Sequence, residues 1–118
     1  MKRALVVDDD KTVAEVLKDM LQMEGWDVMV VDRVKKAIPL CETEVFDVVF
    51  SDLMMPDVRG DAFLEELKKK NSPMADRFII ITGADVSEEI QDKVKELGGR
   101  LIKKPFYLKD IKEILKDL

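Results

Sequence analysis

Residues 5–10 read LVVDDD, an apolar run that passes directly into three aspartates. Leu5, Val6 and Val7 have the pattern of a strand that is buried on both faces, as in a parallel sheet. In open parallel sheets, binding sites lie beyond the carboxyl ends of the strands. The aspartates that follow this strand therefore lie where a functional site is expected.

Two kinds of segment alternate along the rest of the chain. Short apolar or β-branched runs predict strands at residues 4–7, 28–31, 48–50, 78–81 and 101–102. Apolar residues at three- and four-residue spacing predict helices at residues 12–23, 34–41, 60–70, 87–97 and 108–118. The second helix is the least clear, because Pro39 must kink, shorten or displace it. Strand and helix units in this alternation predict an α/β fold with one parallel sheet, helices on both faces and right-handed crossovers.

Length and composition limit the classes of protein to which this chain can belong. A chain of 118 residues suits one domain with one core, here residues 1–118. The lone cysteine, Cys41, cannot form an internal disulfide, and without histidine there is no Cys/His metal site. A net charge of −5 argues against direct binding of nucleic acid. No apolar run approaches the roughly 20 residues of a membrane span, so we expect a cytoplasmic protein without a membrane anchor.

The residues at the strand ends form one candidate site. The first strand ends at Asp8 and Asp9, the third at Asp52, the fourth at Thr82 and the fifth at Lys104. If the first and third strands are neighbours, three carboxylates crowd together and repel one another. Lys104 supplies only one positive charge, so a divalent cation would balance the remaining negative charge of the carboxylates. Oxygen ligands with room for water favour Mg²⁺ over Ca²⁺.

A cation beside a hydroxyl and a lysine forms a receptor for a phosphoryl group. Asp52 is the best candidate for the nucleophile, because it stands alone at the end of the central strand. Asp8 and Asp9 are better placed to hold the metal opposite it. Phosphoryl transfer of this kind needs mainly positioning and charge stabilisation, which this site offers without a histidine base.

Four motifs carry a family resemblance: VVDDD at the first strand, SDLMMPDVRG around Asp52, ITGA at Thr82 and KKPF at Lys104. In this order and spacing they resemble the receiver domains of two-component response regulators, the CheY-like family. The resemblance runs from residue 5 to residue 118. It implies the flavodoxin-like (βα)5 fold, a doubly wound five-stranded parallel sheet with strand order 2-1-3-4-5.

The same resemblance implies roles for single residues. Asp52 would accept the phosphoryl group, Thr82 would be the switch hydroxyl and Lys104 would contact the phosphate. The peptide bond from Lys104 to Pro105 would be cis. The implied ligands of Mg²⁺ are Asp9 directly, Asp8 chiefly through water, Asp52 and the backbone carbonyl of Met54.

The function that this resemblance implies is a switch in a two-component phosphorelay. A sensor histidine kinase or a histidine phosphotransfer protein would donate the phosphoryl group to Asp52. Phosphorylation would change the surface formed by residues 87–118 and so control a downstream effector protein that the sequence does not identify. The chain would not be an enzyme in the usual sense, since it would catalyse only its own phosphorylation and dephosphorylation. It could also be the receiver part of a larger response regulator or hybrid histidine kinase.

Two other functions share parts of the pattern. A flavodoxin-like electron carrier has the same fold, but it needs a phosphate-binding loop rich in hydroxyls and glycine, and DDDKT at residues 8–12 would repel the phosphate of FMN. A Mg²⁺-dependent phosphatase of the haloacid-dehalogenase type carries its nucleophile in a DxDxT motif after the first strand. Residues 8–12 do not match that motif.

Several neighbouring residues have simpler explanations. Asp10 could be a third metal ligand, but an aspartate directly before a helix is more often its N-cap, and we expect the cap. Asp57 and Gly60 indicate turn chemistry, and Met55 and Cys41 are expected to pack in the core.

Two features depart from the family pattern. Leu101 occupies a position where the family carries Tyr or Phe, so an aromatic gate cannot operate in its usual form. Met54 and Ala84 are apolar at positions that orient the attacking water in relatives, which predicts slow self-dephosphorylation.

Overall fold

Five parallel strands form the sheet of this computed structural model, which describes residues 1–83 and 85–118. Their order is β2-β1-β3-β4-β5, as the resemblance implied. Every predicted strand is confirmed, and each extends one or two residues beyond the predicted run. The strands are β1 (Arg3–Val7), β2 (Asp27–Val31), β3 (Val48–Asp52), β4 (Phe78–Thr82) and β5 (Arg100–Lys103).

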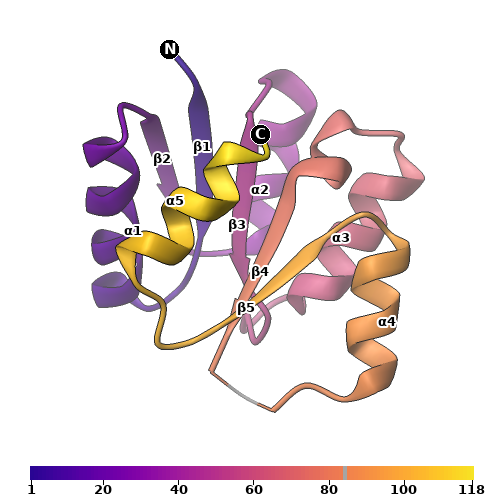
Figure 1. Ribbon diagram of the computed structural model, residues 1–118. Coiled ribbons are helices and arrows are strands. Elements are labelled where there is room, and N and C mark those ends of the chain that lie inside the picture. The colour runs from indigo at the N-terminus through magenta and orange to yellow at the C-terminus, as the bar shows by residue number, and fades with distance from the viewer. Residues whose placement is uncertain (84) are drawn as a thin grey trace.

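Helices cover both faces of this sheet, with α1 and α5 on one face and α2, α3 and α4 on the other (Figure 1). A short 3-10 helix at Pro73–Arg77, which the sequence pattern did not predict, leads into β4. None of the described helices is long and apolar enough to cross a membrane. The helices are α1 (Lys11–Met23), α2 (Val34–Thr43), α3 (Gly60–Lys69), α4 (Glu88–Glu96) and α5 (Leu108–Lys116).

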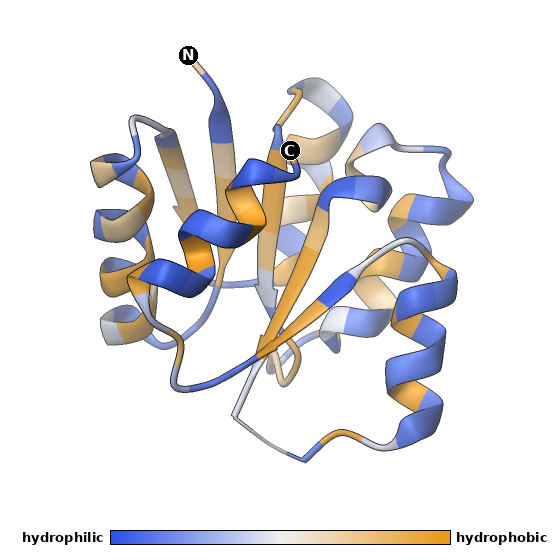
Figure 2. Ribbon diagram, in the orientation of Figure 1, coloured by the Kyte–Doolittle hydropathy of each residue, from blue (hydrophilic) through white to orange (hydrophobic). Residues whose placement is uncertain are grey.

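Each face of the sheet has its own core, because alternate residues of the central strands point in opposite directions. Leu5 and Val7 of β1 pack with α2 and α3, whereas Val6 packs with α1 and α5. The central strands therefore need apolar residues at successive positions, which explains the continuous LVV run. Figure 2 shows β3 and β4 as hydrophobic along most of their length, and α4 as largely hydrophilic.

Pro39 lies inside α2 and does not shorten it. The helix begins at the predicted residue and continues to Thr43, two residues beyond the predicted end. Val34, Ala37 and Cys41 are buried on the core face, whereas Pro39 is exposed. Packing of that face outweighs the one hydrogen bond that a proline removes from the helix.

Candidate functional site

Three carboxylates meet at the carboxyl edge of the sheet, as predicted. β1 pairs with β3 in a register that places Val7 opposite Ser51, so the residues that follow lie side by side. One carboxylate oxygen from each of Asp8, Asp9 and Asp52 lies within 4.8 Å of the other two. Asp8 is only 6% exposed, so the cluster is partly withdrawn from water.

The environment of Asp8 disfavours the charged form of its carboxylate. Burial raises the pKa of Asp8, and the charges of Asp52 and Asp9 raise it further. The backbone N–H of Asp10, which donates to Asp8 Oδ1 at 2.9 Å, and the charge of Lys104 act in the opposite direction. The net shift of the pKa is upward, so burial and the neighbouring carboxylates together outweigh the groups that stabilise the charged form of Asp8.

Lys104 and Thr82 reach the same edge from the next two strands. Lys104 Nζ lies 3.6 Å from Asp52 Oδ2, which confirms the predicted approach of the lysine to the proposed nucleophile. Thr82 is the last residue of β4 and is buried. The backbone N–H of Lys104 donates to the Thr82 carbonyl at 2.8 Å, and the following bond to Pro105 is cis. The structure thus brings all of the predicted strand-end residues to one edge.

The loop after Asp52 packs directly against the start of α3. The backbone N–H of Gly60 donates to the Leu53 carbonyl at 2.8 Å. A Cβ on Gly60 would lie 2.6 Å from the carbonyl oxygen of Asp52 and 3.1 Å from Leu53 Cα. Gly60 is therefore needed for close approach to the peptide of Asp52, which the turn pattern alone did not reveal.

Asp57 has a role that the sequence analysis missed. The Pro-Asp pair indicates a turn, but the carboxylate of Asp57 also accepts hydrogen bonds from the backbone N–H groups of Val34 at 3.2 Å and Lys35 at 2.8 Å. Burial would raise the pKa of Asp57, but these donors outweigh it and lower the pKa. The residue before α2, Arg33, makes no side-chain cap bond of its own. Asp57 thus caps α2 from the loop that follows Asp52, and it ties that loop in place.

The simpler interpretations of three neighbours are confirmed. Asp10 is the N-cap of α1, since its side chain accepts from the N–H groups of Thr12 and Val13. Met55 and Cys41 are buried, as predicted. Burial raises the pKa of the Cys41 thiol to about 11, so it is protonated at neutral pH and poorly reactive.

The two departures from the family pattern lie in different surroundings. Leu101, in β5, is partly buried and packs against the core on the α4 side of the sheet. The side chain of Met54 is 62% exposed, beside the carboxylate cluster in sequence. Ala84 lies outside the described residues.

The donor set fits a hard divalent cation. Asp8, Asp9 and Asp52 offer oxygen atoms alone, and their mutual separation allows one ion to contact all three. The raised pKa of Asp8 indicates that a positive charge at this position would be stabilising. The carbonyl of Met54 as a further ligand stays a prediction.

Comparison with known protein families identifies one match over almost the whole chain. The sequence model of the response regulator receiver domain matches residues 4–116. Among characterised proteins, the nisin biosynthesis regulatory protein NisR of Lactococcus lactis is 25% identical over 109 residues, covering 92% of this chain and 46% of the relative. The chain spans about half the length of the relatives of this kind that it matches.

Solved structures agree with the fold. A CheY-like receiver domain protein from Methanospirillum hungatei superposes with a TM-score of 0.89 at 30% identity, covering 99% of this chain and 92% of that one. The response regulator TrrA from Thermotoga maritima, solved in complex with Mg(2+)-BeF, gives a TM-score of 0.84 at 30% identity, with coverages of 99% and 98%.

Proposed function

Since the chain belongs to the family of response regulator receiver domains, we propose that it is a phosphorylation-dependent switch in which Asp52 is the phosphoacceptor. One observation carries this proposal: the oxygens of Asp8, Asp9 and Asp52 lie within 4.8 Å of one another. Lys104 supports it, because its ammonium group lies 3.6 Å from Asp52. Asp52 is the last residue of β3, the middle strand of the sheet.

The proposed reaction is transfer from a phosphohistidine of a partner protein. An oxygen of the Asp52 carboxylate forms a bond to phosphorus as the bond from phosphorus to the histidine nitrogen breaks, and the nitrogen keeps the electron pair. Lys104 then exchanges its contact with Asp52 Oδ2 for one with a phosphoryl oxygen. The hydroxyl of Thr82 donates to another phosphoryl oxygen. The product is an aspartyl phosphate, about one unit more negative than the free carboxylate.

Receiver domains bind Mg²⁺ at an acidic pocket, and the carboxylates of this chain fit that ion. We assign its binding to Asp8, Asp9 and Asp52, with the backbone carbonyl of Met54 as the further ligand. When bound, Mg²⁺ supplies positive charge that offsets the repulsion between the carboxylates and the incoming phosphoryl group. Asp8 has a second task, because its Oδ1 accepts from the Asp10 N–H and so fixes the turn between β1 and α1.

We propose two partners for this chain, a donor of the phosphoryl group and a downstream effector. The chain contains no histidine, so a sensor histidine kinase or a histidine phosphotransfer protein must bring one. The output surface is α4, β5 and α5, and its occupant is a downstream effector protein whose identity is open. We further propose that residues 1–118 act as one cytoplasmic receiver domain that catalyses only its own phosphorylation and dephosphorylation. Direct contact with nucleic acid or a membrane is not part of the proposed function, in keeping with the net charge of −5.

Intact-mass spectrometry after treatment with a small phosphodonor tests the proposal. Wild-type protein is expected to gain one phosphoryl group when Mg²⁺ is present and none in EDTA. The Asp52→Asn variant should gain none under either condition, whereas Asp92→Asn, an exposed acid on α4, should behave as wild type. An unmodified wild-type protein, or a modified Asp52→Asn protein, would contradict the assignment.

A further inference from the structure

A fully buried carboxylate lies outside the site described above. Asp61, in the first turn of α3, is 0% exposed. Two cations bind it. Arg59 donates through Nε to Oδ1 at 2.5 Å and through Nη2 to Oδ2 at 2.9 Å, and Lys93 Nζ donates to Oδ2 at 3.0 Å. The Arg59 guanidinium, together with Lys93, holds the pKa of Asp61 at about 2 although burial acts against it.

The two cations come from different places in the fold. Arg59 directly precedes α3, two residues before Asp61, whereas Lys93 belongs to α4 and lies 32 residues away in sequence. A buried carboxylate that loses its last partner is strongly destabilised. Here Arg59 stays with Asp61 if α4 moves, so that the contact with Lys93 can break without leaving an unpaired buried charge.

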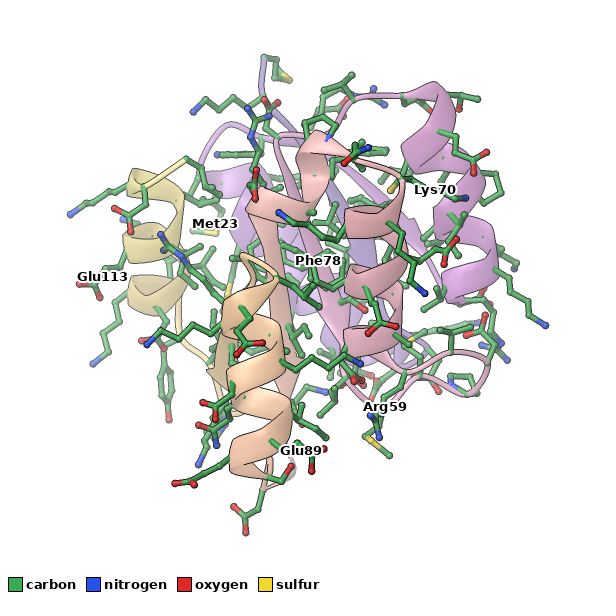
Figure 3. All side chains as sticks on the ribbon, turned by 90° about the vertical axis from the view of Figure 1, so that its right-hand side faces the viewer. Met23, Arg59, Lys70, Phe78, Glu89 and Glu113 are labelled. Carbon is green, nitrogen blue, oxygen red and sulfur yellow. The ribbon has the colours of Figure 1, made fainter. Side chains whose placement is uncertain are left out.

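The rest of α4 buries few side chains. Val94 is the one fully buried residue within Glu88–Glu96, a segment that lies wholly in the described part of the chain. Lys93 also pairs with Glu65 of α3 at 3.3 Å, so both of its ionic contacts hold α4 to α3. Figure 3 shows the two helices side by side, with Arg59 at the start of α3 and Glu89 in the first turn of α4. Val94 and the partly buried Ile90 join α4 to the core, and the two ion pairs of Lys93 add a separate attachment to α3.

The pair is also close in sequence to the phosphoacceptor peptide. Arg59 and Asp61 flank Gly60, where an added Cβ would lie 2.6 Å from the carbonyl oxygen of Asp52. Thr82 connects the site to α4, because it is the last residue of β4 and α4 begins a few residues later in the chain. A movement of Thr82 toward a phosphorylated Asp52 would therefore pull on α4, while Arg59 and Asp61 stay fixed to the start of α3.

We propose that Asp61 and Lys93 form a releasable latch that holds α4 against α3 in the unphosphorylated protein and opens on phosphorylation. Opening of the latch on phosphorylation, its trigger, rests on the proposed function. The contact between Asp61 and Lys93 in the unphosphorylated protein does not. The strength of the latch sets the fraction of unphosphorylated molecules in which α4 is free to move away from α3.

Amide hydrogen exchange, followed by mass spectrometry on unphosphorylated protein, tests the latch itself. Lys93→Met keeps the length of the side chain and removes the charge. We expect it to raise exchange of residues 88–96 about tenfold, the factor that a hydrogen bond between charged groups is worth, and to leave the central strands unchanged. Lys95→Met, at an exposed lysine of the same helix, should match wild type. Unchanged exchange of α4 in Lys93→Met, or an equal increase in Lys95→Met, would overturn the latch.

A second variant distinguishes a latch from a general loss of stability. In Arg59→Met combined with Lys93→Met, Asp61 loses both cations. Exchange should then rise throughout the protein, including the strands. If the double variant affects α4 alone, Arg59 does not hold Asp61 in place as the latch requires, and the proposal fails.

The trigger is tested on phosphorylated protein, with the modified fraction measured by intact mass. Exchange of residues 88–96 should rise in wild type toward the level of Lys93→Met, and the additional rise in Lys93→Met should be smaller. If wild type carries the phosphoryl group and α4 exchange is unchanged, opening on phosphorylation is refuted. If no phosphoryl group is gained, the proposed function fails, and the unphosphorylated comparison alone decides whether the latch exists.

Discussion

Replacing Asp8 with asparagine should stabilise the protein in the absence of Mg²⁺. Asp8 is buried beside the charge of Asp52, and the net effect of its surroundings is to raise its pKa. The hydrogen bond that its Oδ1 accepts from the Asp10 N–H is retained, since asparagine keeps that oxygen. The substitution therefore removes a charge and leaves the local hydrogen bond intact.

The separation of the carboxylates gives the size of the effect. Two unit charges 4.8 Å apart, the upper limit for these oxygens, repel by about 3.5 kcal/mol at an effective dielectric constant of about 20, and by about 1 kcal/mol in water. Lys104 also attracts Asp8 and cancels part of this repulsion. We expect the free energy of unfolding to rise by about 1–2 kcal/mol in Asp8→Asn without Mg²⁺.

Urea denaturation in EDTA measures the stability change caused by Asp8→Asn, and the same experiment in saturating Mg²⁺ measures how much each protein gains from the ion. Wild type should gain about 2.7 kcal/mol when Mg²⁺ is present at about 100 times its dissociation constant, whereas Asp8→Asn should gain much less. Asp19→Asn, at an exposed acid of α1, controls for the change in net charge. If Asp8→Asn is less stable than wild type in EDTA, or if both gain equally from Mg²⁺, the electrostatic account of the cluster is wrong.

Three further predictions concern neighbouring features. Gly60→Ala should lower the free energy of unfolding by about 1–3 kcal/mol in urea denaturation, because its Cβ would lie 2.6 Å from the Asp52 carbonyl oxygen; an unaffected midpoint would show that the loop has room to move. Asp61 has a folded-state pKa of about 2 against an ordinary value of 3.8, so its contribution of about 2 kcal/mol is present above pH 4 and is lost as pH falls toward 2. Denaturation curves of wild type and Asp61→Asn should therefore converge over that interval, and a constant difference would exclude this cause. Met54→Asn should shorten the lifetime of the phosphorylated protein, because an exposed amide can orient an attacking water; an unaltered decay in intact-mass measurements would discard this role.

The strands and the site edge could be predicted from the sequence because their signals are local. Continuous apolar runs such as Leu5 to Val7 mark strands that are covered on both faces. Parallel strands bring their carboxyl ends to one edge, so the residues that follow them had to meet. Asp10 was predicted as a cap for the same reason, since its partners are two and three residues away.

The features that were missed depend on partners far away in sequence. Asp57 looks like a turn residue, but the N–H groups that it caps are 22 and 23 residues distant. Asp61 looks like an ordinary first-turn acid, and its burial under Lys93 becomes visible only when α3 and α4 pack together. Pro39 neither shortens nor displaces α2, because the buried side chains of Val34, Ala37 and Cys41 hold the helix on either side of it.

The most direct test of the whole account is to locate the phosphoryl group on the chain. Protein treated with a small phosphodonor and Mg²⁺ is reduced with borohydride, which converts an aspartyl phosphate to homoserine, and the peptides are sequenced by mass spectrometry. The account predicts homoserine at position 52 and at no other aspartate. Homoserine at Asp8 or Asp9, or none in protein whose intact mass shows one phosphoryl group, would contradict it.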